Sequence, residues 1–169
     1  MEYTHVTHTF EPVYDEHSKI LVLGSFPSVK SREQQFYYGH PQNRFWKVMA
    51  ACFDADVPVT IEEKKVFLLT HQIALWDVIA ECDIVGSSDS SIRNVVPNRM
   101  EQILDVAEID AIFANGDKAY QLFLKYCKKE GQPPLYKLPS TSPANAMWRF
   151  ERLTETWSAQ IHVAADREQ

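Results

Sequence analysis

The chain has 169 residues, 45% of them hydrophobic and 12% aromatic, which is enough for one domain with a sizeable core. Its formal net charge of −6 gives no overall positive field to attract a polyanion, although DNA binding depends only on the few Lys and Arg side chains that meet phosphates. We therefore expect a single domain over residues 1–169 and look for function in local motifs.

Four short apolar runs alternate with amphipathic segments along the chain. The runs predict buried strands at residues 19–24, 73–76, 111–114 and 135–138. Between them, Thr60 with Glu63 and Asn98 with Glu101 form two capping-box patterns, each of which predicts the start of a helix. Apolar residues at helical spacing predict a further helix over residues 117–129.

This alternation of strands and helices predicts the α/β class, as a three-layer α/β/α sandwich with a central, mainly parallel four-stranded sheet. Ligands of such folds bind at the carboxyl ends of the strands. We therefore expect functional residues in the segments after Leu23, Trp76, Ala114 and Leu138. The Ser-rich loop at residues 86–91 is expected to be mobile.

The cysteine and histidine patterns favour neither a disulfide framework nor a metal site. Cys52, Cys82 and Cys127 are widely spaced without a CxxC motif, which indicates reduced, buried thiols. His5 and His8 of the HVTH segment have no further ligand cluster beside them. No apolar run is long enough to cross a bilayer, and no basic segment followed by an apolar run is seen near residue 1. We expect a cytoplasmic protein without membrane association, metal or organic cofactor.

Three segments at the predicted strand ends carry unusual side chains. GSFPS at residues 24–28 follows the first strand and is by itself typical of a tight turn. FYYGHPQNRFWKV at residues 36–48 is rich in aromatic and amide side chains, as are loops that bind a flat ligand. STSPANA at residues 140–146 precedes a helix, and its backbone N–H groups and Ser142 are suited to binding phosphate.

GSFPS, HPQNRFWK and STSPANA in this order resemble the uracil-DNA glycosylase superfamily, and most closely its mismatch-specific branch and its hypoxanthine-DNA glycosylases. The resemblance spans roughly residues 19–157, and HPQNRFWK is its most specific part. It implies a monomeric, monofunctional glycosylase that acts on DNA in base excision repair. Such an enzyme hydrolyses the N-glycosidic bond of a flipped, deaminated base, which is hypoxanthine or uracil.

The resemblance implies that Asn43 is the catalytic residue. The third residue of the first motif is usually an Asp or Asn that holds the attacking water, and here it is Phe26, which cannot accept the water's hydrogen bonds. The hypoxanthine branch is similar in lacking a polar residue at this position, and the resemblance implies that Asn43 takes over its role. An amide can orient water but cannot take up a proton at neutral pH, so turnover is expected to be modest. The alternative role for Asn43 is to cap the helix that follows it.

The predicted base-binding residues follow from the same resemblance and are Gly24, Ser25, Phe26, Ser28, Tyr38, Asp77 and Asn115. Ser28 leaves room for a second ring, Tyr38 stacks on the base, and Asp77 accepts the N1–H of hypoxanthine or the N3–H of uracil. Alternatives remain open for three of them: Tyr38 as a core aromatic, Asp77 in a buried ion pair or as a helix cap, and Asn115 as a helix cap.

The predicted contacts to the DNA backbone are Ser140, Ser142, Pro143, Asn145 and Arg149. Ser140 stands where relatives carry His or Asn, so a contact to the leaving group is expected to be missing. The residue that fills the gap left by the flipped base is Ala144, Asn145 or Met147.

Two other functions remain open at the level of sequence. A non-catalytic nucleic-acid-binding module of the same fold predicts DNA binding without an abasic product. A serine hydrolase using Ser25 or Ser28 with His40 predicts ester cleavage, although GSFPS does not match GxSxG. No lysine stands in a motif position suited to attack on C1′, so strand cleavage is not expected.

Overall fold

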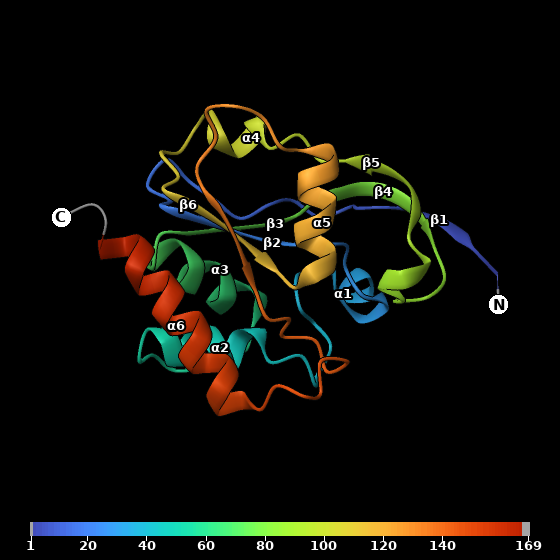
Figure 1. The fold of residues 1–169 in the computed structure, drawn as a ribbon. Coiled ribbons are helices and arrows are strands. Elements are labelled where there is room, and N and C mark those ends of the chain that lie inside the picture. Colours follow the sequence, from blue (N-terminus) through green and yellow to red (C-terminus); the bar gives the residue numbers. More distant parts are fainter. Residues whose placement is uncertain (1, 167–169) are drawn as a thin grey trace.

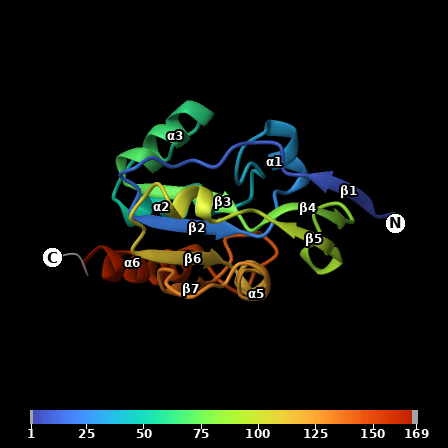
Figure 2. The same ribbon diagram turned by 90° about the horizontal axis from the view of Figure 1, so that it is seen from above.

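The computed structural model describes residues 2–166 and is built around a four-stranded parallel sheet (Figure 1). Its strands lie in the order β3-β2-β6-β7, side by side in Figure 2. Their bounds are Ile20–Gly24 for β2, Ile73–Asp77 for β3, Ala111–Asn115 for β6 and Leu135–Leu138 for β7. Every residue of β2 and β3 is buried, which explains why their sequences are almost continuously apolar. The predicted fold class is confirmed, and each predicted strand is found within one residue of its expected bounds.

Helices cover the sheet on both sides. They are α1 (Val29–Gln34), α2 (Phe45–Cys52), α3 (Ile61–Thr70), α4 (Glu101–Leu104), α5 (Asp117–Tyr126) and α6 (Phe150–Asp166), with a 3₁₀ turn η1 (Asp89–Ser91). In the view of Figure 1, α2, α3 and α6 lie below the sheet and α4 lies above it. Helix α5 packs on β6 and β7, and α2 packs on α6.

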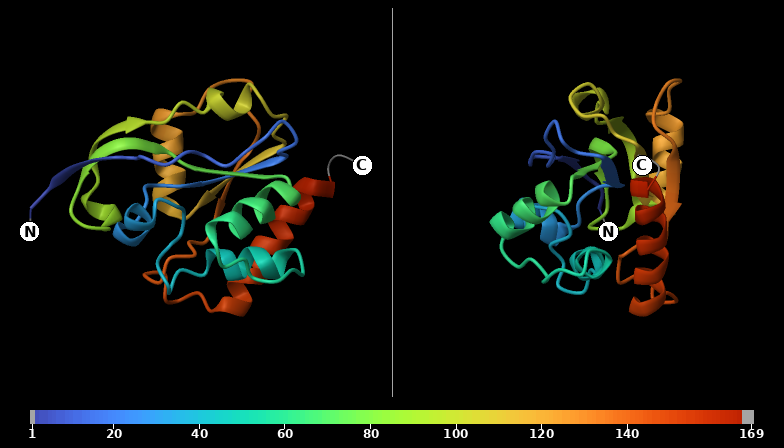
Figure 3. Two further views of the ribbon diagram at one scale, coloured as in Figure 1. Left: turned by 180° about the vertical axis from the view of Figure 1, so that it is seen from behind. Right: turned by 90° about the vertical axis from the view of Figure 1, so that its left-hand side faces the viewer.

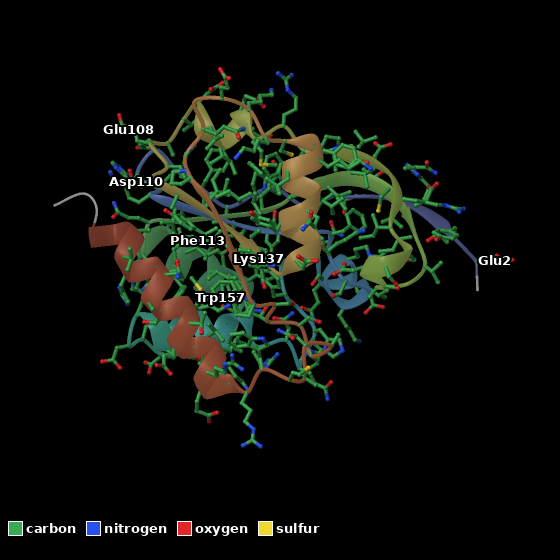
Figure 4. The ribbon with its side chains drawn as sticks, viewed as in Figure 1. Glu2, Glu108, Asp110, Phe113, Lys137 and Trp157 are labelled. Carbon is green, nitrogen blue, oxygen red and sulfur yellow. The ribbon has the colours of Figure 1, made fainter. Side chains whose placement is uncertain are left out.

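The core between sheet and helices is aromatic. Trp157 of α6 is fully buried, donates from Nε1 to the Pro139 carbonyl at 2.9 Å, and meets Phe45 of α2 edge-on at 6.0 Å between ring centroids. Figure 4 shows Trp157 and Phe113 in the interior, whereas Glu108 lies at the periphery. These contacts pack the start of α2, two residues after Asn43, against α6.

A second, antiparallel sheet was not predicted. It consists of β1 (Thr4–Thr7), β4 (Ile79–Ile84) and β5 (Arg93–Pro97) in the order β1-β4-β5. Because β4 starts two residues after β3 ends, this sheet extends from the carboxyl edge of the parallel sheet, away from α2, α3 and α6 (Figure 3, left). It therefore borders the edge where functional residues were expected.

One predicted capping box forms in part and the other is wrong. Thr60 Oγ1 accepts from the backbone N–H of Glu63 at 3.1 Å, whereas Glu63 Oε2 accepts from the N–H of Val59 at 3.2 Å and not from that of Thr60. Asn98, in contrast, donates from Nδ2 to the carbonyls of Asp77 at 2.9 Å and Ile79 at 3.2 Å, and α4 begins only after Met100. The Asn98 amide therefore binds carbonyls at the junction of β3 and β4, instead of capping the helix that the pattern predicted. Helix α5 also ends at Tyr126, before its predicted end at residue 129.

Cys52, Cys82 and Cys127 are free and buried, as predicted. Burial raises the pKa of each thiol to about 11. Within residues 2–166 no helix is both long enough and apolar enough to cross a membrane.

Candidate active site

A cavity of about 380 Å³ opens at the carboxyl edge of the parallel sheet. All seven predicted base-binding residues line it, together with Asn43, Ser140, Ser142 and Pro143. Asn145 and Arg149 of the predicted set lie outside its wall. The volume is in the range of small-ligand sites, so the cavity is large enough for one nucleobase.

Gly24, the last residue of β2, allows two polar side chains to approach the backbone closely. A Cβ atom at this position would lie 2.5 Å from Asp77 Oδ1 and 2.9 Å from the Tyr38 hydroxyl oxygen. Both distances are shorter than van der Waals contact, so any larger residue would displace the carboxylate or the phenol. Glycine is therefore required by the arrangement of the cavity floor.

Tyr38 combines a core contact with a wall of the cavity. Its backbone is left-handed, with φ of 53°, and its ring stacks on Phe45 at 4.1 Å and an interplanar angle of 21°. Its hydroxyl is buried and lies near Asn115 without forming a hydrogen bond of acceptable geometry to any described residue. Burial, and next the charge of Asp77, raise the pKa of Tyr38 well above its ordinary value. A buried hydroxyl without a partner on a cavity wall indicates a place for a polar ligand atom.

Asp77 forms a buried pair with a histidine. Asp77 Oδ2 lies 2.9 Å from His8 Nε2, and the side chains are 2% exposed for His8 and 5% for Asp77. The His8 ring packs against Phe10 at 4.3 Å and Tyr37 at 5.8 Å between centroids. The two alternatives for Asp77 thus coincide, because it is both buried in a polar pair and part of the cavity wall. His8 was missed as a site residue, since it follows β1, which the sequence did not predict.

Asn43 lies just before α2 but is not the N-cap of that helix, which is Arg44. Its Oδ1 accepts from the backbone N–H of Phe45 at 2.9 Å and from the Thr141 hydroxyl at 2.9 Å. The catalytic role of Asn43 stays a prediction. The same residue lines the cavity.

Asn115 holds the loop after β7 and does not cap α5, whose N-cap is Gly116. Its Oδ1 accepts from the backbone N–H of Thr141 at 3.0 Å, and its Nδ2 donates to Thr141 Oγ1 at 3.0 Å. Thr141 has no exposed surface and links Asn115 to Asn43. Sequence reasoning singled out both of its neighbours, Ser140 and Ser142, and passed over Thr141 itself.

The Ser-rich loop forms one side of the cavity and is anchored to the first motif. Ser25 donates to Asp89 Oδ1 at 2.9 Å, and the backbone N–H of Val29 donates to Ser87 Oγ at 2.9 Å. Arg32 donates to the Gly86 carbonyl at 2.6 Å. These anchors are not predictable from the sequence, because each joins residues more than fifty positions apart.

Asp89 brings a second carboxyl group to the cavity. The residue as a whole is exposed, yet the protein around its carboxyl group raises its pKa, and the hydrogen bond from Ser25 opposes that shift. Nothing in the local sequence distinguishes Asp89 from a solvated loop residue.

The serine-histidine arrangement of a hydrolase is not formed. The Ser25 hydroxyl donates to Asp89, and the Ser28 hydroxyl donates to Ser31 Oγ at 3.1 Å. His40 lines the cavity, and its Nδ1 accepts from the backbone N–H of Gln42 at 3.1 Å.

The loop after β7 is clamped by Arg44. Its guanidinium donates to the carbonyls of Ser142 at 3.0 Å and Asn145 at 3.1 Å, and to that of Trp148. Asn145 Nδ2 donates to the Ser140 carbonyl at 2.9 Å, so this side chain braces the loop from within. At the outer end of the loop, Met147 is 92% exposed.

The two histidines of the HVTH segment contact different carboxylates. His5 of the HVTH segment lies 2.8 Å from Asp83 and 3.2 Å from Glu81, whereas His8 pairs with Asp77 elsewhere. Across the part of the chain that the structure describes, no group of three His, Cys, Asp or Glu side chains is arranged to hold a metal ion.

Comparison with known proteins gives a consistent result. The family model of the uracil DNA glycosylase superfamily matches residues 11–160. A hypoxanthine DNA glycosylase of Methanosarcina acetivorans is 36% identical over 154 residues, which cover 89% of this chain and 94% of the relative. One of Methanosarcina barkeri is 32% identical over 112 residues, or 65% of this chain and 71% of the relative. The solution NMR structure of a candidate uracil DNA glycosylase from M. acetivorans matches with a TM-score of 0.75 and 32% identity, covering 92% of this chain and 96% of that one.

Proposed function

Because this chain belongs to the uracil-DNA glycosylase superfamily, we propose that its cavity excises hypoxanthine from DNA in base excision repair. The chain is a DNA glycosylase that acts on deaminated bases. The observation that supports the site is the convergence of Tyr38, Asn43 and Asp77 on one cavity at the carboxyl edge of the sheet. The target nucleotide rotates out of the base stack, at a cost of a few kcal/mol that is smallest for a mispaired base.

The polar groups at the cavity floor suit the edge of hypoxanthine. One Asp77 oxygen is held by His8, and the other lies beside Gly24 at the cavity. That oxygen accepts the N1–H of hypoxanthine, whereas adenine presents a lone pair at N1 and is repelled. Ser28 is small and hydrogen-bonds to Ser31, so it leaves space for the second ring of a purine. Uracil, which offers an N3–H, is a secondary substrate.

Catalysis is assigned to Asn43, which lines the cavity together with Asp89 of the Ser-rich loop. Hydrolysis leaves an abasic site without strand cleavage. Ser140, Ser142, Pro143, Asn145 and Arg149 form the surface that meets the DNA backbone. Met147, at the exposed end of the clamped loop, is the residue that fills the gap in the duplex.

The experiment that tests this function uses purified protein and duplex oligonucleotides that carry a single hypoxanthine, uracil, xanthine or adenine. Alkali-dependent strand breaks at hypoxanthine, with few at adenine, are expected. The Asn43→Ala variant should lose at least about 100-fold in single-turnover rate, by analogy with the removal of one stabilising group from other active sites. DNA binding without abasic product would instead favour the non-catalytic module.

We also propose that the enzyme acts as a monomer in the cytoplasm, where its DNA substrate lies. Sedimentation at assay concentration should give the mass of one 19.5 kDa chain. A stable dimer would contradict this part of the proposal.

A further inference from the structure

Two amide side chains meet on one buried hydroxyl at the back of the cavity. Thr141 accepts from Asn115 Nδ2 at 3.0 Å and donates to Asn43 Oδ1 at 2.9 Å. Thr141 itself is 0% exposed, and its two amide partners are partly buried. The cavity is lined by all three residues.

Asn115, the Thr141 hydroxyl and Asn43 form a row of hydrogen bonds, and a backbone N–H at each end of the row determines which group donates and which accepts. The N–H of Thr141 can only donate, so the Asn115 atom that it meets at 3.0 Å is Oδ1, and Nδ2 is turned to the Thr141 hydroxyl. Having accepted that bond, the hydroxyl gives its single proton to Asn43. At the other end, the N–H of Phe45 meets Asn43 at 2.9 Å, which independently requires Oδ1 there. The two ends agree, so neither amide can be flipped without losing two hydrogen bonds.

Asn43 has one polar side-chain atom, its Nδ2, without a hydrogen-bond partner among the described residues. Its Oδ1 has accepted two hydrogen bonds, while its Nδ2 makes none to any described residue. We propose that Asn43 acts on the substrate as a hydrogen-bond donor through Nδ2, directed at the departing base, and that Thr141 and Asn115 are positioning residues that maintain this orientation. The inference rests on the proposed function, since it assigns a role within that reaction.

Donation suits the charge that develops in the reaction. When the N-glycosidic bond breaks, its electron pair leaves with the base, and the sugar becomes an oxocarbenium-like cation. Water then adds to C1′ and loses a proton to solvent, and the base is protonated. Hypoxanthine offers N3, N7 and O6 as acceptors, so an N–H aimed at one of them stabilises the negative charge as it forms. A water held by the same N–H would have one lone pair fewer for attack, which makes the base the better target.

The Asn43→Asp substitution separates donation from acceptance with almost no change of shape. One carboxylate oxygen still accepts from Thr141 and Phe45, but an anionic oxygen replaces the NH₂ group at the cavity. Single-turnover excision of hypoxanthine at neutral pH should fall about 100-fold or more. Activity should then rise as the pH is lowered and the carboxyl group gains an O–H donor. The Asn43→Ala variant at each pH is the matched control for acid-dependent loss of the base.

The opposite result overturns the proposal. If Asn43 serves to accept a proton-bearing water, Asp at this position is as active as wild type or more active at neutral pH, and loses activity on acidification. If the wild-type protein does not excise hypoxanthine at all, the result contradicts the proposed function and not only the donor role of Asn43.

Thr141 provides a second, independent test. Thr141→Val is nearly isosteric and removes only the hydroxyl, and Thr141→Ser keeps it. We expect Val to lower kcat about 10-fold with little change in KM, as for loss of an interaction made in the transition state, and Ser to restore most of the rate. In the Asn43→Ala background the Thr141→Val effect should disappear, because Thr141 acts through Asn43. An equal loss in both backgrounds contradicts the positioning role, and denaturant unfolding of each variant identifies a simple loss of stability.

Discussion

The parallel and antiparallel sheets of this molecule meet at the cavity but are built on different principles. Strands β2 and β3 are buried along their whole length. Strands β1 and β5 are mostly exposed, and polar contacts supplement their ladders: His5 lies 2.8 Å from Asp83, and Arg93 lies 3.6 Å from the centre of the Tyr3 ring. The parallel sheet supplies a rigid frame, and the antiparallel sheet brings the side chains of flanking segments to that frame. Site geometry therefore depends in part on a sheet that reaches the core mainly through Ile79, Cys82 and Ile84 of β4.

The largest expected contrast between the sheets is in stability. Phe113 of β6 is 0% exposed, and Phe113→Ala should lower the free energy of unfolding by about 4 kcal/mol through lost burial and a residual cavity. Val96 of β5 is 47% exposed, and Val96→Ala should change it by no more than about 0.5 kcal/mol. Urea unfolding followed by tryptophan fluorescence measures both. Similar losses would show that the two sheets are equally important to stability.

His8 connects the antiparallel sheet to Asp77 in the cavity wall. Its backbone N–H donates to the carbonyl of Ala80 in β4 at 2.7 Å, and its side chain pairs with Asp77. His8→Ala leaves Asp77 Oδ2 buried without its partner and should cost about 2 kcal/mol of unfolding free energy. His8→Gln keeps an N–H donor and serves as the control. We also expect His8→Ala to reduce discrimination between hypoxanthine and adenine, measured as the ratio of single-turnover rates. Unchanged discrimination would mean that Asp77 keeps its position without His8.

Asp89, on the loop between β4 and β5, gives the smallest effect. Its pKa is raised in the folded state above its ordinary value of 3.8, so its contribution to stability is fully present below that value and is lost as the pH rises through the raised pKa. In the Asp89→Asn variant the amide oxygen still accepts from Ser25, but the side chain no longer titrates. The free energy of unfolding should therefore fall less steeply as the pH rises above about 3.8. Thermal unfolding from pH 3.5 to pH 7 measures the slope of stability against pH, and we expect the slopes of the two proteins to differ only slightly, because solvent screens a charge on an exposed residue. A steeper profile in the variant would contradict the raised pKa.

The same contrast explains which parts of the molecule the sequence predicts. Strands β2, β3 and β6 are predictable from the sequence because they are buried and almost continuously apolar. Strand β7 is shorter and mostly only partly buried. The antiparallel strands have no such run: β1 and β5 contain no buried residue, and in β4 the acidic Glu81 and Asp83 interrupt the apolar residues. Asn98 shows a further limit, since its amide serves carbonyls about twenty positions earlier in the chain rather than the helix that follows it.

Residues of the candidate site that lie in a sequence motif or directly after a strand were predictable. Their hydrogen-bond partners elsewhere in the chain were not. Gly24, Tyr38, Asn43 and Asp77 follow strands or lie in recognisable segments, and all reach one cavity. The partners that orient them lie far away along the chain: His8 is 69 positions from Asp77, and Thr141 is 98 positions from Asn43. A single sequence contains no record of such pairings. The roles of the residues stay predictions, while their convergence is a structural finding.

The clamp formed by Arg44 has a mechanical consequence. Arg44 directly follows Asn43, and its side chain grips three carbonyls of the segment that ends beside Met147. If Met147 enters the duplex as proposed, a force on this segment would reach the backbone next to Asn43 through the Arg44 guanidinium. Weakening these three hydrogen bonds would then separate capture of the lesion from catalysis, with each of the two parts still folded.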